Sequence, residues 1–396
     1  MSDDWWDVPG NPYAPAPVAP SPVGPPPVPE APGAASQNSG HADHRQDGDL
    51  CAPYAAAEGL TLEAASAALV RLDCGLAASS PAVAAGWTKR MAIEEAAASA
   101  RLNGILVDTA DLRLLAWDSL DRAPDPDLAQ ALPLYDLVRR LTARHPRHLY
   151  TPRRLAALDR IRNSRFQGFS LWSDAEEDVG AEQRWSVLQA ALAPEALARF
   201  RAAPALVGAA TFLAHWHEVG ADRSAGAALG RLLAAWWPAR QGLVQGRRGT
   251  ISLAMVEGSD TYDGPTHPAY AGGPVLMPSI GFLGHAMEYR PDRRDGWVGA
   301  YLRAAERSLD RGEAVLRRLR AAESGLAEAL RPRRSTSRGP QVAAFLLSQP
   351  VVTSGRLAQA LDMSGTAARS LLDALHRDRL LMEISGRDAY RAYIVE

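Results

Sequence analysis

Residues 351–375 have the sequence VVTSGRLAQALDMSGTAARSLLDAL, in which apolar residues recur every three or four positions on both sides of Asp362. This pattern predicts two short amphipathic helices joined by a tight turn. We expect Ser354 to cap the first helix and Ser364 the second, because a serine hydroxyl can accept a hydrogen bond from a backbone N–H of the first turn. Two helices joined in this way form a helix-turn-helix, which places its second helix in the major groove of DNA.

The second of these helices is predicted to have one apolar and one polar face, as a helix that both packs and binds a partner requires. The residues expected on the buried side are Ala368, Leu371, Leu372 and Leu375. Those expected on the opposite side are Thr366, Ser370, Asp373 and Arg377, with Arg369 on the flank. The polar side therefore carries groups that can meet base edges and phosphates.

Further elements flank the two helices on both sides. An earlier helix, against which both can pack, is predicted by three apolar residues at helical spacing, which are Val342, Phe345 and Leu346. Beyond the second helix, residues 381–384 and 389–394 have the pattern of two short strands, joined through residues 386–388. Three helices followed by a hairpin predict a winged helix-turn-helix over residues 335–396.

The charge of this C-terminal region favours nucleic acid as its partner. Residues 331–396 contain ten Arg against six Asp and Glu, an excess of four positive charges. The residues predicted to bind double-stranded DNA are Ser354, Arg356, Thr366, Arg369, Ser370, Arg387 and Arg391. We expect Thr366, Arg369 and Ser370 to face the bases and the other arginines to contact phosphates. Further phosphate contacts are expected from the preceding arginines, which are Arg331, Arg333, Arg334 and Arg338.

The composition of the whole chain bounds its class. It has 396 residues, 47% of them apolar, which is enough for two or more folded units. The formal net charge is −2, so affinity for DNA must come from local clustering of arginines. Cys51 and Cys74 are the only cysteines, and no apolar run reaches the roughly 20 residues that span a bilayer. We therefore expect a soluble cytoplasmic protein without a membrane segment.

The rest of the chain divides into two predicted regions. Residues 1–50 are rich in Pro and Ala and then polar, so they cannot bury enough apolar surface to offset the entropy of ordering, and we predict disorder. Residues 51–330 are predicted to be mainly helical, with a Gly- and Pro-rich loop over 243–295. A helix over Met91–Leu102 is expected to end at Asn103-Gly104, and Asp108 is expected to begin the next one. Further helices are expected over Pro133–Ala143, Pro152–Arg162, Pro194–Ala202 and Trp297–Leu330. The fold class is thus mainly α, with a small β-hairpin wing.

Three landmarks in the helical region resemble the Fic domain, a helical fold whose active members transfer AMP from ATP. Residues 98–104, ASARLNG, are similar to the family's N-terminal Ser-x-x-x-Glu-Gly helix, with Asn103 where Glu is usual. Residues 230–243, GRLLAAWWPARQGL, resemble the core helix and the Gly-Leu that ends it, and residues 295–302, DGWVGAYL, resemble the helix that follows. A C-terminal winged helix is a common accessory of Fic domains. The chain also resembles a family of alphaproteobacterial proteins, often plasmid-borne, that join a degenerate Fic-like domain to a helix-turn-helix.

The segment before Gly230 lacks the catalytic pattern of the Fic family. Active members have His-Pro-Phe-x-Asp/Glu-Gly-Asn-Gly-Arg there, in which the His is the base and the Gly-rich turn binds phosphates through backbone N–H groups. This chain has HWHEVGADRSAGAAL over residues 215–229, and only Gly230-Arg231 agrees with the end of the motif. The resemblance therefore implies a catalytically degenerate domain for dimerisation or sensing, and we predict no catalytic residue, cofactor or metal site.

Two other patterns were weighed as sites. Zinc or iron could be bound by the side chains of His215, His217 and Glu218. The rings of His215 and His217, however, point about 200° apart around a helix, because the residues are two positions apart. This spacing favours ordinary helix residues over metal ligands. The Gly-rich residues 242–249 lack the order of a phosphate-binding loop and indicate a surface turn.

The sequence as a whole predicts a bacterial DNA-binding protein, a transcriptional regulator that binds duplex through its winged helix and forms a homodimer. Two alternatives stay open. The first is a diverged AMP or nucleotidyl transferase of the Fic type. The second is a plasmid-maintenance or toxin–antitoxin partner whose winged helix docks a protein, because Asp373 on the second helix would repel phosphate.

Overall fold

The computed structural model describes residues 56–117, 124–142, 181–221, 226–244, 276–283, 296–331, 338–387 and 391–395, together with the single residues 119, 150 and 152. These residues are mainly helical and include one small sheet near the C-terminus, as the sequence predicts. All of them belong to one compact unit, which spans residues 50–250 and 266–396. The predicted disorder of residues 1–50 lies outside the described residues, as do most of the predicted helix Pro152–Arg162 and most of the loop 243–295.

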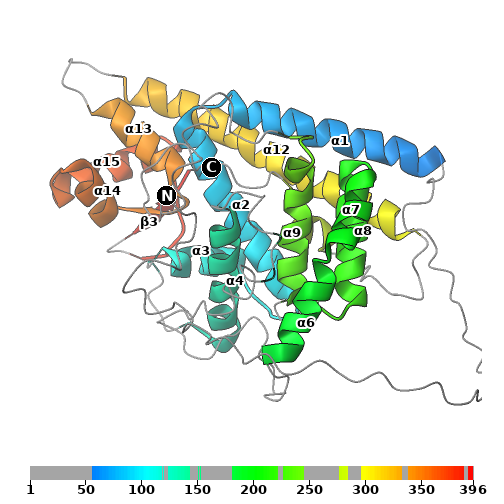
Figure 1. Ribbon diagram of the computed structural model, residues 1–396. Coiled ribbons are helices and arrows are strands. Elements are labelled where there is room, and N and C mark those ends of the chain that lie inside the picture. Colours follow the sequence, from blue (N-terminus) through cyan, green and yellow to red (C-terminus); the bar gives the residue numbers. More distant parts are fainter. Residues whose placement is uncertain are drawn as a thin grey trace, which may run out of the picture. The chain divides into compact units, whose positions relative to one another are not determined.

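The order of elements is as follows. The helices before the C-terminal region are α1 (Ala56–Ala77), α2 (Pro81–Leu102), α3 (Thr109–Ala116), α4 (Pro126–Thr142), α6 (Ala181–Ala191), α7 (Pro194–Ala202), α8 (Ala205–Glu218), α9 (Gly226–Arg240), α11 (Pro278–Phe282) and α12 (Trp297–Ala329). The C-terminal region contains α13 (Gly339–Ser348), β1 (Val352–Thr353), α14 (Ser354–Leu361), α15 (Gly365–Arg377), β2 (Met382–Glu383) and β3 (Ala392–Ile394). In Figure 1, α1 and α12 lie side by side, and α13, α14 and α15 lie together at one end.

The long helix α12 packs along α1 and also contacts α2, α8 and α11. It is one continuous helix of 33 residues, close to the predicted Trp297–Leu330. It contacts α2 at Gly312, whose carbonyl accepts a hydrogen bond of 2.8 Å from Trp87 Nε1. A methyl group at Gly312 would lie 2.7 Å from Leu72 and 3.2 Å from the Trp87 ring, so only glycine lets the helices meet this closely.

A cluster of aromatic rings fills the core between α7, α8 and α9. Phe212 stacks on Trp237 with ring centroids 5.5 Å apart, and Tyr150 and Phe200 meet the Trp237 ring edge-on. Trp216 Nε1 donates to the Gly226 carbonyl over 2.9 Å. Because Trp236 and Trp237 are both buried, they serve core packing, as the apolar pattern of their helix indicates.

Local capping rules account for two helix ends in this region, whereas one predicted helix start is wrong. Asp108 begins α3 by accepting a hydrogen bond from Ala110 N, and α2 ends at Asn103 before Gly104, which has a φ of 81°. Both were predicted. Pro133, predicted to begin a helix, lies inside α4 instead. The helix begins earlier, at Pro126, where Asp125 accepts a hydrogen bond of 2.8 Å from Leu128 N.

The C-terminal region is docked on α2 through a buried arginine. Arg90 is 7% exposed, and its Nη1 donates to the Leu347 carbonyl over 2.8 Å, while its Nη2 donates to the Gln349 carbonyl over 2.9 Å. These carbonyls lie at and just beyond the end of α13, where a helix leaves its last acceptors without partners. Gly86, one turn earlier on α2, gives the Leu347 carbonyl room to approach. Burial lowers the pKa of Arg90 to about 9, so the guanidinium stays charged at neutral pH.

We expect the substitution Arg90→Met to lower the free energy of unfolding by about 2 to 4 kcal/mol, because it leaves two carbonyls in a buried interface without donors. Urea denaturation followed by circular dichroism measures the change. The matched control is Arg303→Met, which removes an exposed arginine from α12 and should change the free energy by less than about 0.5 kcal/mol. Equal losses in the two variants would show that the Arg90 contacts contribute no net stability.

Candidate functional site

The C-terminal region forms three helices and a three-stranded antiparallel sheet. The strand order is β1-β3-β2, so β3 is central and pairs with both neighbours. Tyr393 on β3 lies opposite Val352 on β1 and Glu383 on β2. The sequence predicts the β2–β3 hairpin but not β1, whose two residues are too few to show a strand pattern.

The ends of α14 and α15 are set by capping side chains. Thr353 Oγ1 accepts a hydrogen bond of 3.3 Å from Arg356 N, so Thr353 caps α14 and the prediction of Ser354 is wrong by one residue. Thr353 has the extended backbone of a cap residue, whereas Ser354 is already helical. Ser364 Oγ accepts from Ala367 N over 3.2 Å, which confirms the predicted cap of α15. Between the helices, Asp362 adopts a left-handed conformation with φ of 47°.

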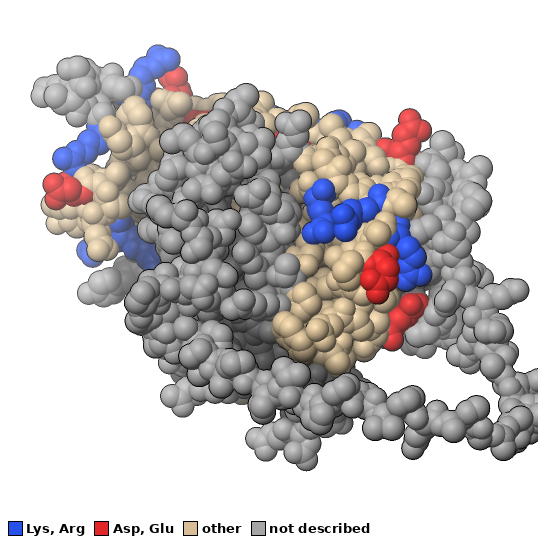
Figure 2. All heavy atoms as spheres, viewed as in Figure 1, with Lys and Arg blue, Asp and Glu red and all other residues tan. Residues whose placement is uncertain are grey.

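Helix α15 exposes the face that the sequence predicts to meet the bases. Ala368, Leu372 and Leu375 are buried and Leu371 is partly buried, so the predicted apolar side faces inward. The three residues predicted to face the bases, Thr366, Arg369 and Ser370, are all exposed. Figure 1 shows α14 and α15 beyond α13 at the edge of the molecule, and Figure 2 shows both basic and acidic side chains at this end. The predicted reading face is thus accessible to a partner.

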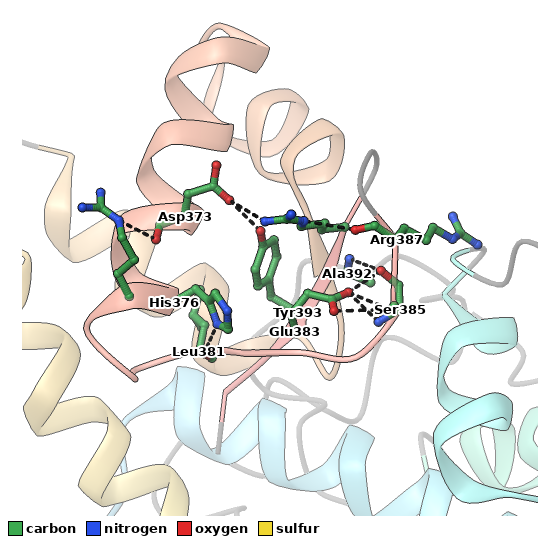
Figure 3. Close-up of polar contacts among 11 residues, drawn as sticks. Asp373, His376, Leu381, Glu383, Ser385, Arg387, Ala392 and Tyr393 are labelled. Atoms are coloured by element: carbon green, nitrogen blue, oxygen red, sulfur yellow. Dashed lines mark hydrogen bonds and ion pairs between the residues drawn. The ribbon is translucent and has the colours of Figure 1, made fainter.

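Asp373 is only partly exposed, although its position in the helical pattern predicts a place on that free face. Its carboxylate turns toward β3, where Tyr393 Oη donates to Asp373 Oδ1 over 2.7 Å (Figure 3). Arg391 Nη1 lies 3.9 Å from the same oxygen. The difference is a tertiary effect, because Tyr393 comes from β3 and Arg391 directly precedes it, and the helical period of α15 carries no information about either.

A compact network holds the turn that follows β2. The Glu383 carboxylate accepts hydrogen bonds from Ser385 N over 2.7 Å and from Gly386 N over 3.1 Å, and Ser385 Oγ also donates to it. Ser385 Oγ accepts in turn from Ala392 N on β3 over 3.1 Å (Figure 3). Gly386 has a φ of 64°, a conformation that glycine adopts without strain. These hydrogen bonds therefore fix the conformation of the turn after β2.

Several arginines predicted to contact phosphates also form hydrogen bonds within the protein. Arg387 Nη2 donates to the Ser119 carbonyl over 2.9 Å, and Arg391 Nε donates to the Arg387 carbonyl over 3.0 Å. Arg338 donates to the carbonyls of Leu361 and Asp362 and so caps the end of α14. Of the other predicted phosphate contacts, Arg356 is partly buried, Arg331 pairs with Glu328 over 3.2 Å, and Arg333 and Arg334 lie outside the described residues.

Two of the landmarks that resemble the Fic domain meet in a buried polar cluster. Ser99 on α2 and Arg231 on α9 both contact Ser279 on α11: Ser99 Oγ lies 2.8 Å from Ser279 Oγ, and Arg231 Nε donates to that oxygen over 2.8 Å. Glu95, one turn before Ser99, accepts from Ser279 N over 3.2 Å and from Ile280 N over 3.3 Å. All four residues are buried.

Burial decides the electrostatics of this cluster. It raises the pKa of Glu95 to about 7, although hydrogen bonds from Ser279 and the charge of Arg231 oppose the rise. Burial also lowers the pKa of Arg231 to about 10. Neither Glu95 nor Ser279 belongs to a motif that predicts a site. A signal for Glu95 exists, because the spacing of Met91, Glu95 and Ser99 places a carboxylate on the buried side of an otherwise Ala-rich helix.

The histidines weighed as metal ligands lie in ordinary helix surroundings. His215 Nε2 is 3.2 Å from the Ala190 carbonyl and its ring contacts Phe200, while the His217 ring lies edge-on to Trp297. Among the described residues, no three His, Cys, Asp or Glu side chains are grouped so that they could hold a metal ion. No helix in the same part of the chain has the length and apolar character needed to cross a bilayer.

No protein-family model matches the sequence, and no curated protein matches it. The resemblance to the Fic domain and to the plasmid-borne helix-turn-helix family stays a prediction.

The raised pKa of Glu95 predicts a pH dependence of stability. Between about pH 4.5 and 7 the folded state binds more protons at Glu95 than the unfolded chain does, so this group makes the free energy of unfolding fall as pH rises. We expect Glu95→Gln to remove up to about 3 kcal/mol of this fall. Urea denaturation at a series of pH values from 4.5 to 7.5 measures it.

The matched control for this measurement is Glu94→Gln, which changes the neighbouring carboxylate that pairs with exposed Arg311 over 2.7 Å. This variant should keep the pH dependence that Glu95 causes. Parallel curves for wild type and Glu95→Gln would mean that burial does not shift the titration of Glu95.

Proposed function

We propose that this chain is a DNA-binding protein that acts as a transcriptional regulator, with α13 to α15 and the β1-β3-β2 sheet as its winged helix-turn-helix. The observation that carries the proposal is the exposed side of α15. There Thr366, Arg369 and Ser370 are accessible, while the apolar side of the same helix is packed inward. Hydroxyl and guanidinium groups at the start of a second helix are suited to hydrogen bonds with base edges and phosphates.

The surface of the C-terminal region favours a polar partner over a protein with an apolar docking site. Protein interfaces depend on large apolar or aromatic anchors. Among the described residues, the exposed large hydrophobic side chains are Val70, Leu106, Trp185 and Met382, and of these only Met382 belongs to the C-terminal region. The docking alternative therefore has less support than DNA binding.

The affinity of one copy should be modest, because several arginines of the region are already bonded within the protein. Each phosphate that a protein neutralises contributes to both affinity and salt dependence. Two copies that bind neighbouring half-sites would double these contacts, which is the common use of helix-turn-helix motifs. We therefore propose that the protein binds as a homodimer and that the Fic-like helical region supplies dimerisation or sensing.

No observation favours the transferase alternative. Ser99 and Arg231, which belong to the landmarks that resemble the Fic domain, are buried and bonded to one another and to Ser279. Backbone amides arranged to bind a nucleotide would be the supporting observation, and residues 222–225, which precede α9, lie outside the described residues.

Selection of bound sites from random duplex by the full chain tests the proposal. We expect enrichment of a defined sequence, with affinity that falls as salt rises by a slope of about −0.9 for each phosphate contacted. Arg369→Ala should weaken binding to the selected duplex by about 1 to 3 kcal/mol and relax the preference at one base position. Fluorescence anisotropy measures both effects.

Arg303→Ala is the matched control, because it removes an exposed arginine from α12, outside the C-terminal region. It should leave the affinity within about twofold of wild type, since most surface changes away from an interface have small effects. No enrichment of any duplex by the full chain, or equal affinity of Arg369→Ala and wild type, would overturn the proposal.

A further inference from the structure

Asp373 is an acidic residue on the helix that we propose to bind DNA. A carboxylate near phosphates weakens binding by repulsion, so charge alone predicts that its removal strengthens binding. We infer that Asp373 is instead a positioning residue, whose carboxylate holds β3 and Arg391 against α15, so that its removal weakens DNA binding. This inference rests on the proposed function and adds a role for one residue of its binding unit.

The first step is the set of contacts that Asp373 makes. Tyr393 Oη donates to Asp373 Oδ1 over 2.7 Å, and Arg391 Nη1 lies 3.9 Å from the same oxygen (Figure 3). The Tyr393 ring also packs near the ring of His376, with centroids 5.8 Å apart. Two residues of α15, one turn apart, therefore contact the same tyrosine.

The second step is the place of Tyr393 in the sheet. β3 is the central strand, and Tyr393 lies opposite Val352 on β1 and Glu383 on β2. β1 ends at Thr353, which also caps α14. A contact that fixes Tyr393 relative to α15 therefore fixes both helices of the helix-turn-helix relative to the sheet.

The third step concerns the wing. Arg391 Nε donates to the Arg387 carbonyl over 3.0 Å, so the arginine that faces Asp373 also bonds to the β2–β3 connection. A hydrogen bond with Tyr393 raises the pKa of Arg391, and the charge of Asp373 adds to the rise. Asp373 thus contacts Tyr393 and Arg391 at the protein surface, and the geometry that these contacts maintain is what a DNA duplex would meet.

Asp378, a second aspartate near the C-terminal end of α15, serves as a control for the loss of a negative charge. Asp378 directly follows α15 and is exposed, and it stands at a helix C-terminus, where a negative charge gives no stabilisation. Substituting either aspartate by a neutral residue changes the net charge by one unit. Repulsion from phosphates predicts the same sign for both, whereas positioning predicts opposite signs.

The experiment measures binding of a duplex selected by the wild-type protein to full-length Asp373→Ala, Asp373→Asn, Asp378→Asn and Tyr393→Phe. We expect Asp373→Ala and Tyr393→Phe each to weaken binding by about tenfold. Asp373→Asn keeps an acceptor for Tyr393 and should recover part of the affinity, which a general loss of structure would not. Asp378→Asn should leave the affinity unchanged or raise it by up to about twofold.

A double-mutant cycle tests the contact itself without DNA. The thermal midpoints of Asp373→Ala, Tyr393→Phe and the double variant should show that the second substitution has less effect when the first is present. If Asp373→Ala binds DNA as tightly as Asp378→Asn or more tightly, the positioning role is overturned while DNA binding stands. Additive midpoints would overturn the contact, and failure of the wild type to bind any duplex would overturn the proposed function and with it the effect on DNA.

Discussion

Helix α2 is buried along most of its length, so almost every polar side chain on it must find a partner inside the protein. Trp87 finds one on α12, Arg90 at the end of α13, and Glu95 and Ser99 on α11. Each partner lies far away in the sequence. Because a buried donor or acceptor without a partner costs more than most single contacts contribute, this requirement fixes how α2 sits against the other helices.

The same helix fixes the C-terminal region relative to the helical region. Arg90 and Gly86 bring α13 onto α2, and Leu346 and Leu347 of α13 are buried. The C-terminal region that carries the exposed side of α15 is therefore packed against α2, and is not joined to the helical region by the chain alone. A shift of α2 would also move α13, because closely packed helices deform little.

The arginines of the C-terminal region show how sequence charge and interface charge can differ. The excess of four positive charges in residues 331–396 suggests a basic surface. Arg338 bonds to the carbonyls at the end of α14, and Arg387 and Arg391 bond to the carbonyls of Ser119 and Arg387, so part of this charge is engaged within the protein. Arg369 on α15 is exposed, as are Arg377 and Arg379.

The sequence by itself determined the helical class, the presence of two short helices on either side of Asp362, the cap of the second, and which side of the second helix is apolar. These follow from the helical period and from caps that act within three residues, as with Ser364 and Ala367. Only the tertiary structure decided the direction of Asp373, the bond of Arg387 to Ser119 and the cluster around Glu95. Their partners are between 20 and 268 residues away, and a local pattern carries no information about which distant group will meet a side chain once the core has packed.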